Sequence, residues 1–564
     1  MINQVVERTI ARVLGIGSAL VAVVVVTGSV TDPVNVTKLF AIGAIAVSAM
    51  VVAGFNGFGF IWSDSRFALL GAAVFLLTGF SAIYFSDAPL VQNLYGEYGR
   101  NTGFLTYLLL ILIFISTLAL RRDGSFRLLL WGLFVAGAIN VIYCLWVVIF
   151  GDPISWNNPY GNILGTFGNP NFIGAFLGFF ASALVAFAIK NKFNRYAIFA
   201  TVAVFLIAVF EIIDSSAIQG RVVVLAGLAI VGFYLIRWMF DSLIPQFAYI
   251  TVVGIGGVFA LLGALQKGPL TSYIYKTSVS LRGEYWQAGW NMARENPWTG
   301  VGFDTYGDWY RKVRDDQALI LPGPDTVTNA AHNVPFDVLA SGGWPLFIPY
   351  VFIVLLALIS IIKVTLRNKS YNPVFVAMTT AWVGYQLQSI ISINQIGLAI
   401  WGWLFSGALI AFEVSTRDGK STTEQPKFNK SKSRRAAEQT FSPALLAGIG
   451  IVVGGLIAYP PYAADNKWRN ALASSSVEQL ESALVPAYLN PQNSYKYVSA
   501  ISLFEQNKFY DLALKYAKVA VEFNPNDFDS WKIYYSISKS TLEEKAIAFE
   551  NMKRLDPLNP AFLG

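Results

Sequence analysis

The sequence predicts an all-α, polytopic membrane protein of about 12–13 transmembrane helices, followed by a C-terminal domain of helical repeats. Two observations on the 564-residue chain predict the membrane part. Residues of the AVILMFWYC set make up 55% of the chain and charged residues only 13%, with a mean hydropathy of +0.52. Apolar stretches of spanning length also follow one another along most of it. Because a soluble protein of this length would expose much of that apolar surface, lipid has to cover it.

A spanning helix needs about 20 predominantly apolar residues. The segments that meet this requirement are 10–30, 36–54, 66–84, 103–120, 127–150, 171–189, 196–213, 222–240, 246–265, 343–362, 372–391, 396–414 and 441–459. The first could be mistaken for a secretory signal, since Arg8 and Arg12 precede it. No small-residue cleavage site with a soluble domain follows, so we interpret it as an uncleaved transmembrane helix.

The positions of the basic residues predict the orientation. Short loops rich in Lys and Arg face the cytoplasm. Basic clusters occur at 121–127, at 190–195, after Arg237, at 363–369 and within 415–440. The intervening loops are rich in Gly, Asn, Pro and aromatic residues, and they are 85–101, 151–170, 214–221, 266–342 and everything after 460. This alternation predicts a protein of the cytoplasmic (inner) membrane with a cytoplasmic N-terminus. It also explains the net charge of +7 without a nucleic-acid partner.

We divide the chain into four parts. Residues 1–415 form the polytopic membrane domain with its large outer loop at 266–342, and 416–440 form a polar, basic cytoplasmic linker. The last transmembrane helix at 441–459 returns the chain to the outside, where a soluble domain occupies 462–564. This division predicts an extracytoplasmic C-terminal domain.

The C-terminal domain contains a repeat. Y-L-N-P-Q-N (488–493) recurs as E-F-N-P-N-D (522–527), which moves the proline from 491 to 525, a step of 34, and R-L-D-P-L-N (554–559) follows. Paired amphipathic helices lie between these motifs. A helix–turn–helix of 34 residues with Pro after its second helix is similar to a tetratricopeptide repeat. The alternative is a bundle of unrelated helical hairpins.

Three polar clusters in the outer loops lie at the starts of apolar helices. Arg100 directly precedes one helix, Arg221 lies at the start of another, and Asn169 and Asn171 flank Pro170 at a third. Positive side chains and the free N–H groups of helix N-termini attract anions, so these clusters predict a shared anion site at the outer leaflet. The alternative is that each arginine extends toward lipid headgroups. Because the positive-inside bias depletes outer arginines, we favour the anion site.

The large loop carries two further motifs. S-L-R-G-E-Y-W-Q-A-G-W-N-M-A-R-E (280–295) predicts a helix that stops at Asn296, with Arg282, Trp286 and Trp290 on one face along the membrane surface. N-P-W-T-G-V-G-F-D-T-Y (296–306) follows and predicts a tight turn. The loop closes with A-H-N-V-P-F-D-V-L-A-S-G-G-W, whose His332 is the only histidine of the chain.

In this order the motifs resemble the large periplasmic loop of the O-antigen ligase superfamily. The shared features are R-x-x-x-W in a helix, N-P-x-x-G-x-G, A-H-N before a glycine-bearing helix, and the earlier F-G-N-P-N motif. The resemblance covers roughly residues 60–415. Members of the superfamily commonly have Ser-Arg where this chain has Gly220-Arg221, and the helix after the histidine begins G-G-W-P here.

The resemblance implies glycan transfer from an undecaprenyl-diphosphate carrier to a glycan, lipid or protein acceptor, without metal, cofactor or nucleotide sugar. Guanidinium groups would stabilise the diphosphate leaving group. His332 would act as a general base or orient the acceptor hydroxyl. Asn333 either binds substrate or caps the next helix, and Asp304 either orients an acceptor or pairs with an arginine. The predicted catalytic residues are His332 and Arg282. The predicted substrate-binding residues are Arg100, Arg221, Asn169, Asn171, Trp286, Asn333 and Asp304.

Three alternatives to a ligase remain. A polysaccharide polymerase would use the same motifs. A flippase or transporter of lipid-linked glycan predicts internal pseudo-symmetry and polar residues at the membrane midplane, and the sequence shows neither. A scaffold would use the helices as a simple anchor. In each case the C-terminal repeats predict a protein partner, since stacked repeats present concave binding faces.

Overall fold

The computed structural model describes residues 2–155, 158–191, 194–417, 441–474 and 476–562, and within these ranges the chain forms helices and no β-strand. Ten described helices are long and apolar enough to cross a membrane: α2 (Asn35–Tyr84), α5 (Asp123–Phe150), α6 (Pro170–Ala188), α7 (Arg195–Asp214), α8 (Ile218–Met239), α9 (Leu243–Ala264), α14 (Val334–Arg367), α15 (Pro373–Ile391), α16 (Ile396–Ser415) and α17 (Pro443–Ser474). The prediction of an all-α, polytopic membrane protein is confirmed.

All thirteen predicted segments fall on helices. Two of them merge in α2, which has a non-helical residue, Ser65, at the place where the sequence predicts the intervening turn. The two remaining segments fall on α1 (Gln4–Val23), which carries charges in its first half, and on the short α4 (Phe104–Thr117). Helix α1 ends at Val23 and not at the predicted residue 30. Buried Lys38 explains this end, because its Nζ donates to the carbonyls of Val21 and Ala22.

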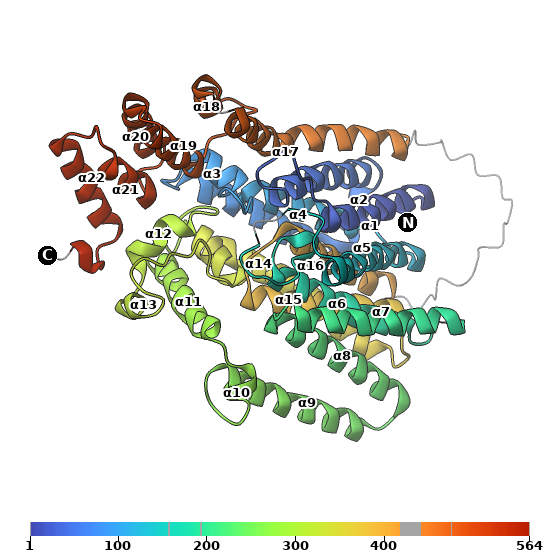
Figure 1. The fold of residues 1–564 in the computed structure, drawn as a ribbon. Helices are drawn as coiled ribbons and strands as arrows, with labels where there is room; N and C mark the ends of the chain where they lie inside the picture. The colour runs from blue at the N-terminus through green and yellow to red at the C-terminus, as the bar shows by residue number, and fades with distance from the viewer. Residues whose placement is uncertain (1, 156–157, 192–193, 418–440, 475, 563–564) are drawn as a thin grey trace.

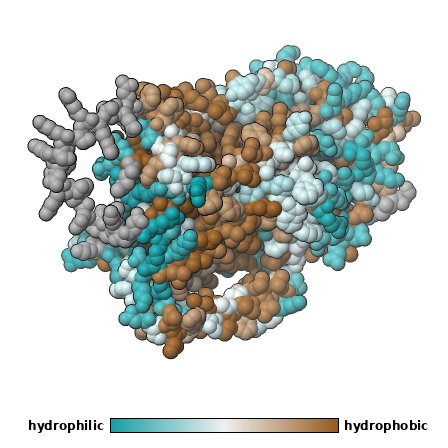
Figure 2. Space-filling model, turned by 180° about the vertical axis from the view of Figure 1, so that it is seen from behind, coloured by the Kyte–Doolittle hydropathy of each residue, from teal (hydrophilic) through white to brown (hydrophobic). Residues whose placement is uncertain are grey.

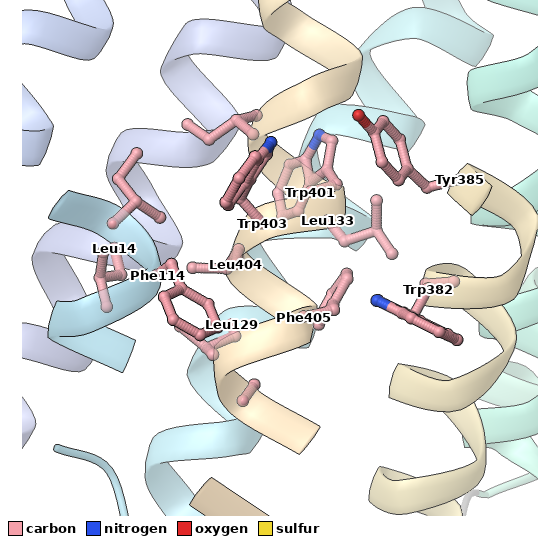
Figure 3. Close-up of a cluster of buried hydrophobic side chains, with 14 of the residues drawn as sticks. Leu14, Phe114, Leu129, Leu133, Trp382, Tyr385, Trp401, Trp403, Leu404 and Phe405 are labelled. Atoms are coloured by element: carbon pink, nitrogen blue, oxygen red, sulfur yellow. The ribbon is translucent and has the colours of Figure 1, made fainter. Parts of the chain in front are cut away.

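Helix α16 lies at the centre of the bundle. Its apolar window is fully buried, and Figure 3 shows Trp401, Trp403, Leu404 and Phe405 of this helix among side chains from neighbouring helices. The indole of Trp382 on α15 donates to Ser406 Oγ of α16 over 2.8 Å. By contrast, only 6% of the apolar window of α9 is buried, and α9 packs beside α8 at the edge of the bundle (Figure 1). The apolar surface left by such peripheral helices forms a broad band between more hydrophilic ends (Figure 2). A bilayer would cover this band.

The basic loops meet at one end of the bundle, beside the N-terminus (Figure 1). Arg122 pairs with Glu7 of α1, Arg127 donates to Asn191, and Arg237 donates to the carbonyl of Thr365. These contacts join loops that the sequence assigns to the cytoplasm. The loops with the predicted site residues and the C-terminal helices lie at the opposite end. This grouping supports the predicted alternation of loops, and which end faces the cytoplasm stays a prediction.

The large outer loop is folded against the start of α14. Its helices are α10 (Thr271–Ile274), α11 (Thr277–Glu295), α12 (Tyr306–Val313) and α13 (Asp316–Ile320). The turn at 296–302 packs on a break in α14 at Gly343, where the N–H of Trp344 donates to Pro297 O over 2.9 Å. Gly300 has a φ of +64°, and a Cβ there would lie 2.4 Å from the backbone of Gly342. Gly300 in the turn and Gly343 in α14 therefore allow the two backbones to touch.

The C-terminal part consists of α18 (Val477–Leu484), α19 (Ser494–Gln506), α20 (Tyr510–Phe523), α21 (Phe528–Ser536) and α22 (Leu542–Leu555), with a final 3-10 turn, η2 (Pro560–Phe562). The predicted boundary near residue 460 lies inside α17, which continues through Pro460 and Pro461 to Ser474. Trp468, on this continuation, belongs to the core of the C-terminal domain. The domain contains the predicted helical hairpins, and their membership of the tetratricopeptide family stays a prediction. Most of the predicted linker, 418–440, lies outside the described residues.

Candidate active site

His332 lies in a short turn directly before α14. Its backbone is left-handed, with a φ of 53°. Its ring packs against Tyr285 of α11 at a centroid distance of 5.3 Å, and Nδ1 lies 3.3 Å from the carbonyl oxygen of Ala330. This contact favours the tautomer in which Nδ1 carries the hydrogen, which leaves Nε2 as an acceptor. Among the residues that the structure describes, Nε2 has no hydrogen-bond partner.

Burial is the main reason why the pKa of His332 falls to about 4. The hydrogen bond to Ala330 raises this pKa, whereas the positive charges of Arg282 and Arg100 lower it. The imidazole is therefore neutral at physiological pH. A neutral imidazole with a free Nε2 can accept a hydrogen bond, and then a proton, from a hydroxyl group.

The turn around His332 is held by its neighbours in sequence. Asn333 is the N-cap of α14, and its Oδ1 accepts from the N–H of Phe336 over 3.0 Å. Asp337 Oδ1 accepts from the N–H of Ala331 over 2.7 Å. Both contacts fix the backbone on either side of the histidine, so the capping role that we considered for Asn333 is observed.

Arg282 and Trp286 come from α11, which passes beside this turn. Arg282 is half-buried, and no ion-pair partner for it occurs in the described ranges. Burial lowers its pKa, and the neighbouring Tyr285 raises it. Trp286 stacks on Phe336 of α14 at a centroid distance of 6.1 Å, and its buried Nε1 has no hydrogen-bond partner among the described residues. An unpaired guanidinium beside a neutral imidazole is suited to an anionic ligand.

Arg100 and Asp304 form a second, buried cluster. Arg100 Nε lies 3.3 Å from Asp304 Oδ1, and their side chains are 9% and 2% exposed. Asp304 Oδ2 also accepts from the N–H groups of Glu97 and Thr102. Burial lowers the pKa of Arg100, but Asp304, Asp337 and Glu97 together raise it above its usual value. Asp304 therefore pairs with an arginine, as one of our two interpretations predicts, and it keeps that arginine charged.

A cavity of about 790 Å³ adjoins Arg100 at this end of the bundle. It is lined by the turn after α1, by the 3-10 turn η1 (Gly165–Phe167) and by the N-terminal ends of α2, α6 and α16. Asn169, the N-cap of α6, accepts from the N–H of Asn171 over 2.9 Å and lines the cavity. Positive helix ends and Arg100 make this cavity favourable for an anion.

Most lining residues of this cavity were not predicted from the sequence, and Asp32, Asn394, Gln395 and Arg469 are among them. Asn394 and Gln395, between α15 and α16, are 6% and 4% exposed. Gln395 Oε1 accepts from the N–H of Leu398, whereas its buried Nε2 and the buried Oδ1 of Asn394 have no partner in the described part of the chain. Arg469, on the continuation of α17, donates from Nε to Gly28 O over 2.8 Å. Buried donors without partners are costly, and a ligand with acceptor oxygens would satisfy Gln395.

Two predicted residues lie outside this cluster. Arg221 is exposed on α8, and its Nη2 lies 3.4 Å from Ile213 O. The structure thus brings together Arg282, Arg100 and His332, whereas Arg221 does not line this cavity. Asn171 contributes its backbone carbonyl, which accepts from Gln219, and it does not line the cavity of Asn169.

A second cavity, of about 370 Å³, contains His332. Its other lining residues are Glu97, Tyr285, Gly307, Asp308, Arg311, Val327, Thr328, Asn329, Asp527, Phe528 and Asp529. Asn329 lines both cavities, and its backbone carbonyl and Oδ1 accept from Arg100. The contact between Arg100 and Asn329 therefore lies where the two cavities meet. Among the described residues, no group of three or more His, Cys, Asp or Glu side chains is placed to hold a metal ion.

Comparison with known proteins identifies one part of this chain. The family model described as O-antigen ligase matches residues 173–351, from α6 into α14. The matched range includes Arg282 and His332, whereas Arg100, Gln395 and Arg469 lie outside it. No curated protein matches the chain.

Proposed function

We propose that this protein is a ligase, because the family model described as O-antigen ligase matches residues 173–351 and supports a membrane glycosyltransferase of the ligase or polymerase type. It transfers a glycan from undecaprenyl diphosphate to an acceptor hydroxyl at the outer face of the cytoplasmic membrane. The observation that carries the proposal is the shared wall of the two cavities. One cavity is suited to an anion, the other holds the histidine, and Asn329 lines both.

The larger cavity is the candidate site of the donor diphosphate. Arg100, the N-terminus of α6 and the unpaired Nε2 of Gln395 offer positive charge and hydrogen-bond donors to phosphate oxygens. Its volume of about 790 Å³ lies within the usual range of ligand pockets. Arg282, which has no carboxylate partner among the described residues, adds positive charge beside His332.

In the proposed reaction the acceptor hydroxyl attacks the anomeric carbon of the donor glycan. The new carbon–oxygen bond forms while the bond to the diphosphate breaks, and the diphosphate leaves with the electron pair. The hydroxyl proton passes to Nε2 of His332, which is free to accept it. Because a bound diphosphate is negative, it raises the pKa of the nearby imidazole and makes it a stronger base.

The experiment that tests the proposal is a profile of carrier-linked glycan in a deletion strain complemented with His332→Ala. A ligase predicts that full-length carrier-linked glycan accumulates. Accumulation of single repeat units would favour the alternative, a polymerase. Normal carrier pools would contradict both and would remove the enzyme hypothesis.

The outer location needs its own test. Asn329→Cys and Lys369→Cys place thiols at opposite ends of the bundle, and native Cys144 is buried. The proposal predicts that a membrane-impermeant maleimide labels the cysteine at 329, and not the one at 369, in cells whose outer surface is accessible. The reverse pattern would place His332 in the cytoplasm and exclude the proposed donor site.

A further inference from the structure

The C-terminal domain forms one wall of the cavity that contains His332. Asp527, Phe528 and Asp529, at the start of α21, line it opposite Tyr285 and His332 of the membrane domain. The domain thus adjoins the candidate active site itself, and not only the membrane helices that carry it.

Buried ion pairs hold this wall in place. Asp556, fully buried after α22, accepts from Arg314 Nη2 over 2.7 Å and from Arg311 Nη1 over 3.0 Å. The Arg311 guanidinium also lies over the ring of Phe528, 4.3 Å from its centroid. Removing one member of a buried pair leaves an uncompensated charge, so the ion pairs fix the end of α22 against α12, and the contact with Phe528 adds the start of α21.

The first outer loop makes a second connection to the C-terminal domain. Asn524 Nδ2 donates to Gln92 Oε1 over 3.2 Å and to Asp308 Oδ2 over 3.1 Å. Tyr98 stacks on Tyr495 at a centroid distance of 4.6 Å and an interplanar angle of 6°. A domain docked at two places, with buried polar contacts, is a fixed part of the site.

The acidic and aromatic side chains that line the smaller cavity indicate which kind of ligand it binds. Four carboxylates line it, those of Glu97, Asp308, Asp527 and Asp529, and its one guanidinium, Arg311, already pairs with Asp556. Glu97 Oε2 is buried and has no hydrogen-bond partner in the described ranges. Burial raises the pKa of Glu97 well above its usual value, and those of Asp308 and Asp527 to about 6 and about 7, so this set is partly protonated near neutral pH. Carboxyl groups form hydrogen bonds with hydroxyl groups, and those that stay charged repel phosphate. The rings of Tyr285 and Phe528 add flat apolar surface beside them.

We propose that the C-terminal domain, together with the outer loop, forms the acceptor site, and that this site binds an uncharged, hydroxyl-bearing sugar and excludes phosphorylated acceptors. The proposal deepens the proposed glycosyl transfer and rests on it for the role of His332. It assigns the C-terminal helices to acceptor selection. The volume of about 370 Å³ is sufficient for a small ligand.

The test labels a cysteine, placed in the C-terminal-domain part of the smaller cavity, with a maleimide in the full-length protein. Asp529→Cys introduces a thiol at an exposed lining position, while the native Cys144 is buried. Glu522→Cys, exposed on α20 and outside the cavity, is the matched control. The probe is the neutral oligosaccharide released from the surface glycan of the producing cell, compared with the same oligosaccharide carrying one phosphate.

The neutral oligosaccharide is expected to slow maleimide labelling at position 529 several-fold, without effect at position 522, and the phosphorylated form is expected to protect weakly. Unchanged labelling at 529, or equal protection by both forms, would overturn the proposal. As a second measurement, Asp529→Lys is expected to raise the acceptor KM and leave the donor KM unchanged. If the oligosaccharide protects position 529 but the wild-type protein transfers no glycan, the proposed function fails and the sugar site stands.

Discussion

The two cavities of this protein share a wall but differ in charge. The larger one presents Arg100, Arg469, helix N-termini and one acidic residue, Asp32, whereas the smaller one presents four acidic residues and a neutral imidazole. The difference in charge indicates that the two cavities bind different substrates. In the proposed reaction the anionic leaving group is stabilised on one side, and the uncharged nucleophile is held on the other. Changes on one side should therefore affect one substrate, which gives the following predictions.

The largest effect is expected at His332, in the smaller cavity. His332→Ala removes the acceptor of the hydroxyl proton and should lower the transfer rate by about 10²- to 10⁴-fold. His332→Asn is the matched variant, because asparagine tolerates the left-handed backbone at this position but does not take up a proton. Both variants should be inactive and stably folded, as measured by glycan transfer and thermal unfolding. An active His332→Asn protein would exclude a role in proton transfer.

Arg282→Ala should lower kcat by about 10²- to 10³-fold, the usual loss for one group that stabilises developing charge. Since Arg282 has no ion-pair partner among the described residues, the substitution leaves no carboxylate unpaired and should not unfold the protein. Arg294→Ala, exposed on the same helix, is the control and should retain wild-type turnover. Equal losses in both variants would show that helix α11 contributes only through its overall charge.

Asp556→Asn should loosen the contact between the large outer loop and the part of the C-terminal domain that lines the smaller cavity, Asp527–Asp529. Breaking this buried pair costs about 3–5 kcal/mol, which should appear as faster proteolysis of the C-terminal domain and a raised acceptor KM, with donor binding unchanged. Asp511→Asn breaks an exposed pair with Lys539 and should cost at most about 1 kcal/mol. A loss of donor affinity in Asp556→Asn would mean that the two cavities are not independent.

Gln395→Glu tests the donor side with almost no change of shape. The variant keeps an oxygen for the N–H of Leu398 but replaces the unpaired Nε2 with a negatively charged oxygen. The loss of one hydrogen bond to a charged group, about 1.5–3 kcal/mol, predicts at least a roughly tenfold higher donor KM and no change for the acceptor. Gln317→Glu, exposed in the outer loop, adds the same charge elsewhere and should leave donor KM unaffected.

The smallest effect is expected from pH within the neutral range. The pKa of His332 is about 4, so kcat/KM should vary little between about pH 6 and 8 and should fall as protonation begins near pH 4. The same shift makes the folded state lose stability as pH falls from about 6.5 toward 4, because only the unfolded chain binds the proton in that window. The acid limb of kcat should lie at higher pH than that of kcat/KM, since bound diphosphate raises the pKa. If the acid limbs of kcat and kcat/KM lay at the same pH, the proposed position of the diphosphate close to His332 would be contradicted.

The membrane helices were predictable because their signal is local. Each apolar segment falls on a helix, and the turn between the second and third appears as the break at Ser65. The end of α1 was not predictable, since Lys38 caps it from the next helix. The short helices α3 (Leu90–Tyr95), α10, α12 and α13 were also missed, because a helix of four to eight residues is too short for a periodic pattern to identify it.

The candidate site was predictable in part. Arg100, Arg282 and His332 stand out as charged or titratable groups in outer loops, and the structure brings them together. Gln395 and Asn394 had a weaker signal, two polar residues in a short turn between apolar helices, and their importance depends on burial. Arg469 and Asp529 were missed because the sequence separates their domain from the membrane helices. Only the docking of the C-terminal helices brings them to the two cavities.

The central claim, that the anion cavity holds the donor and the acidic cavity the acceptor, is tested most directly by a structure of the full-length protein with an undecaprenyl-diphosphate-linked glycan. We predict density for the diphosphate in the larger cavity, with phosphate oxygens within hydrogen-bond distance of Arg100 and Gln395 Nε2, and the first sugar pointing toward His332. A diphosphate beside exposed Arg221, or among Glu97, Asp308 and Asp529, would contradict the account.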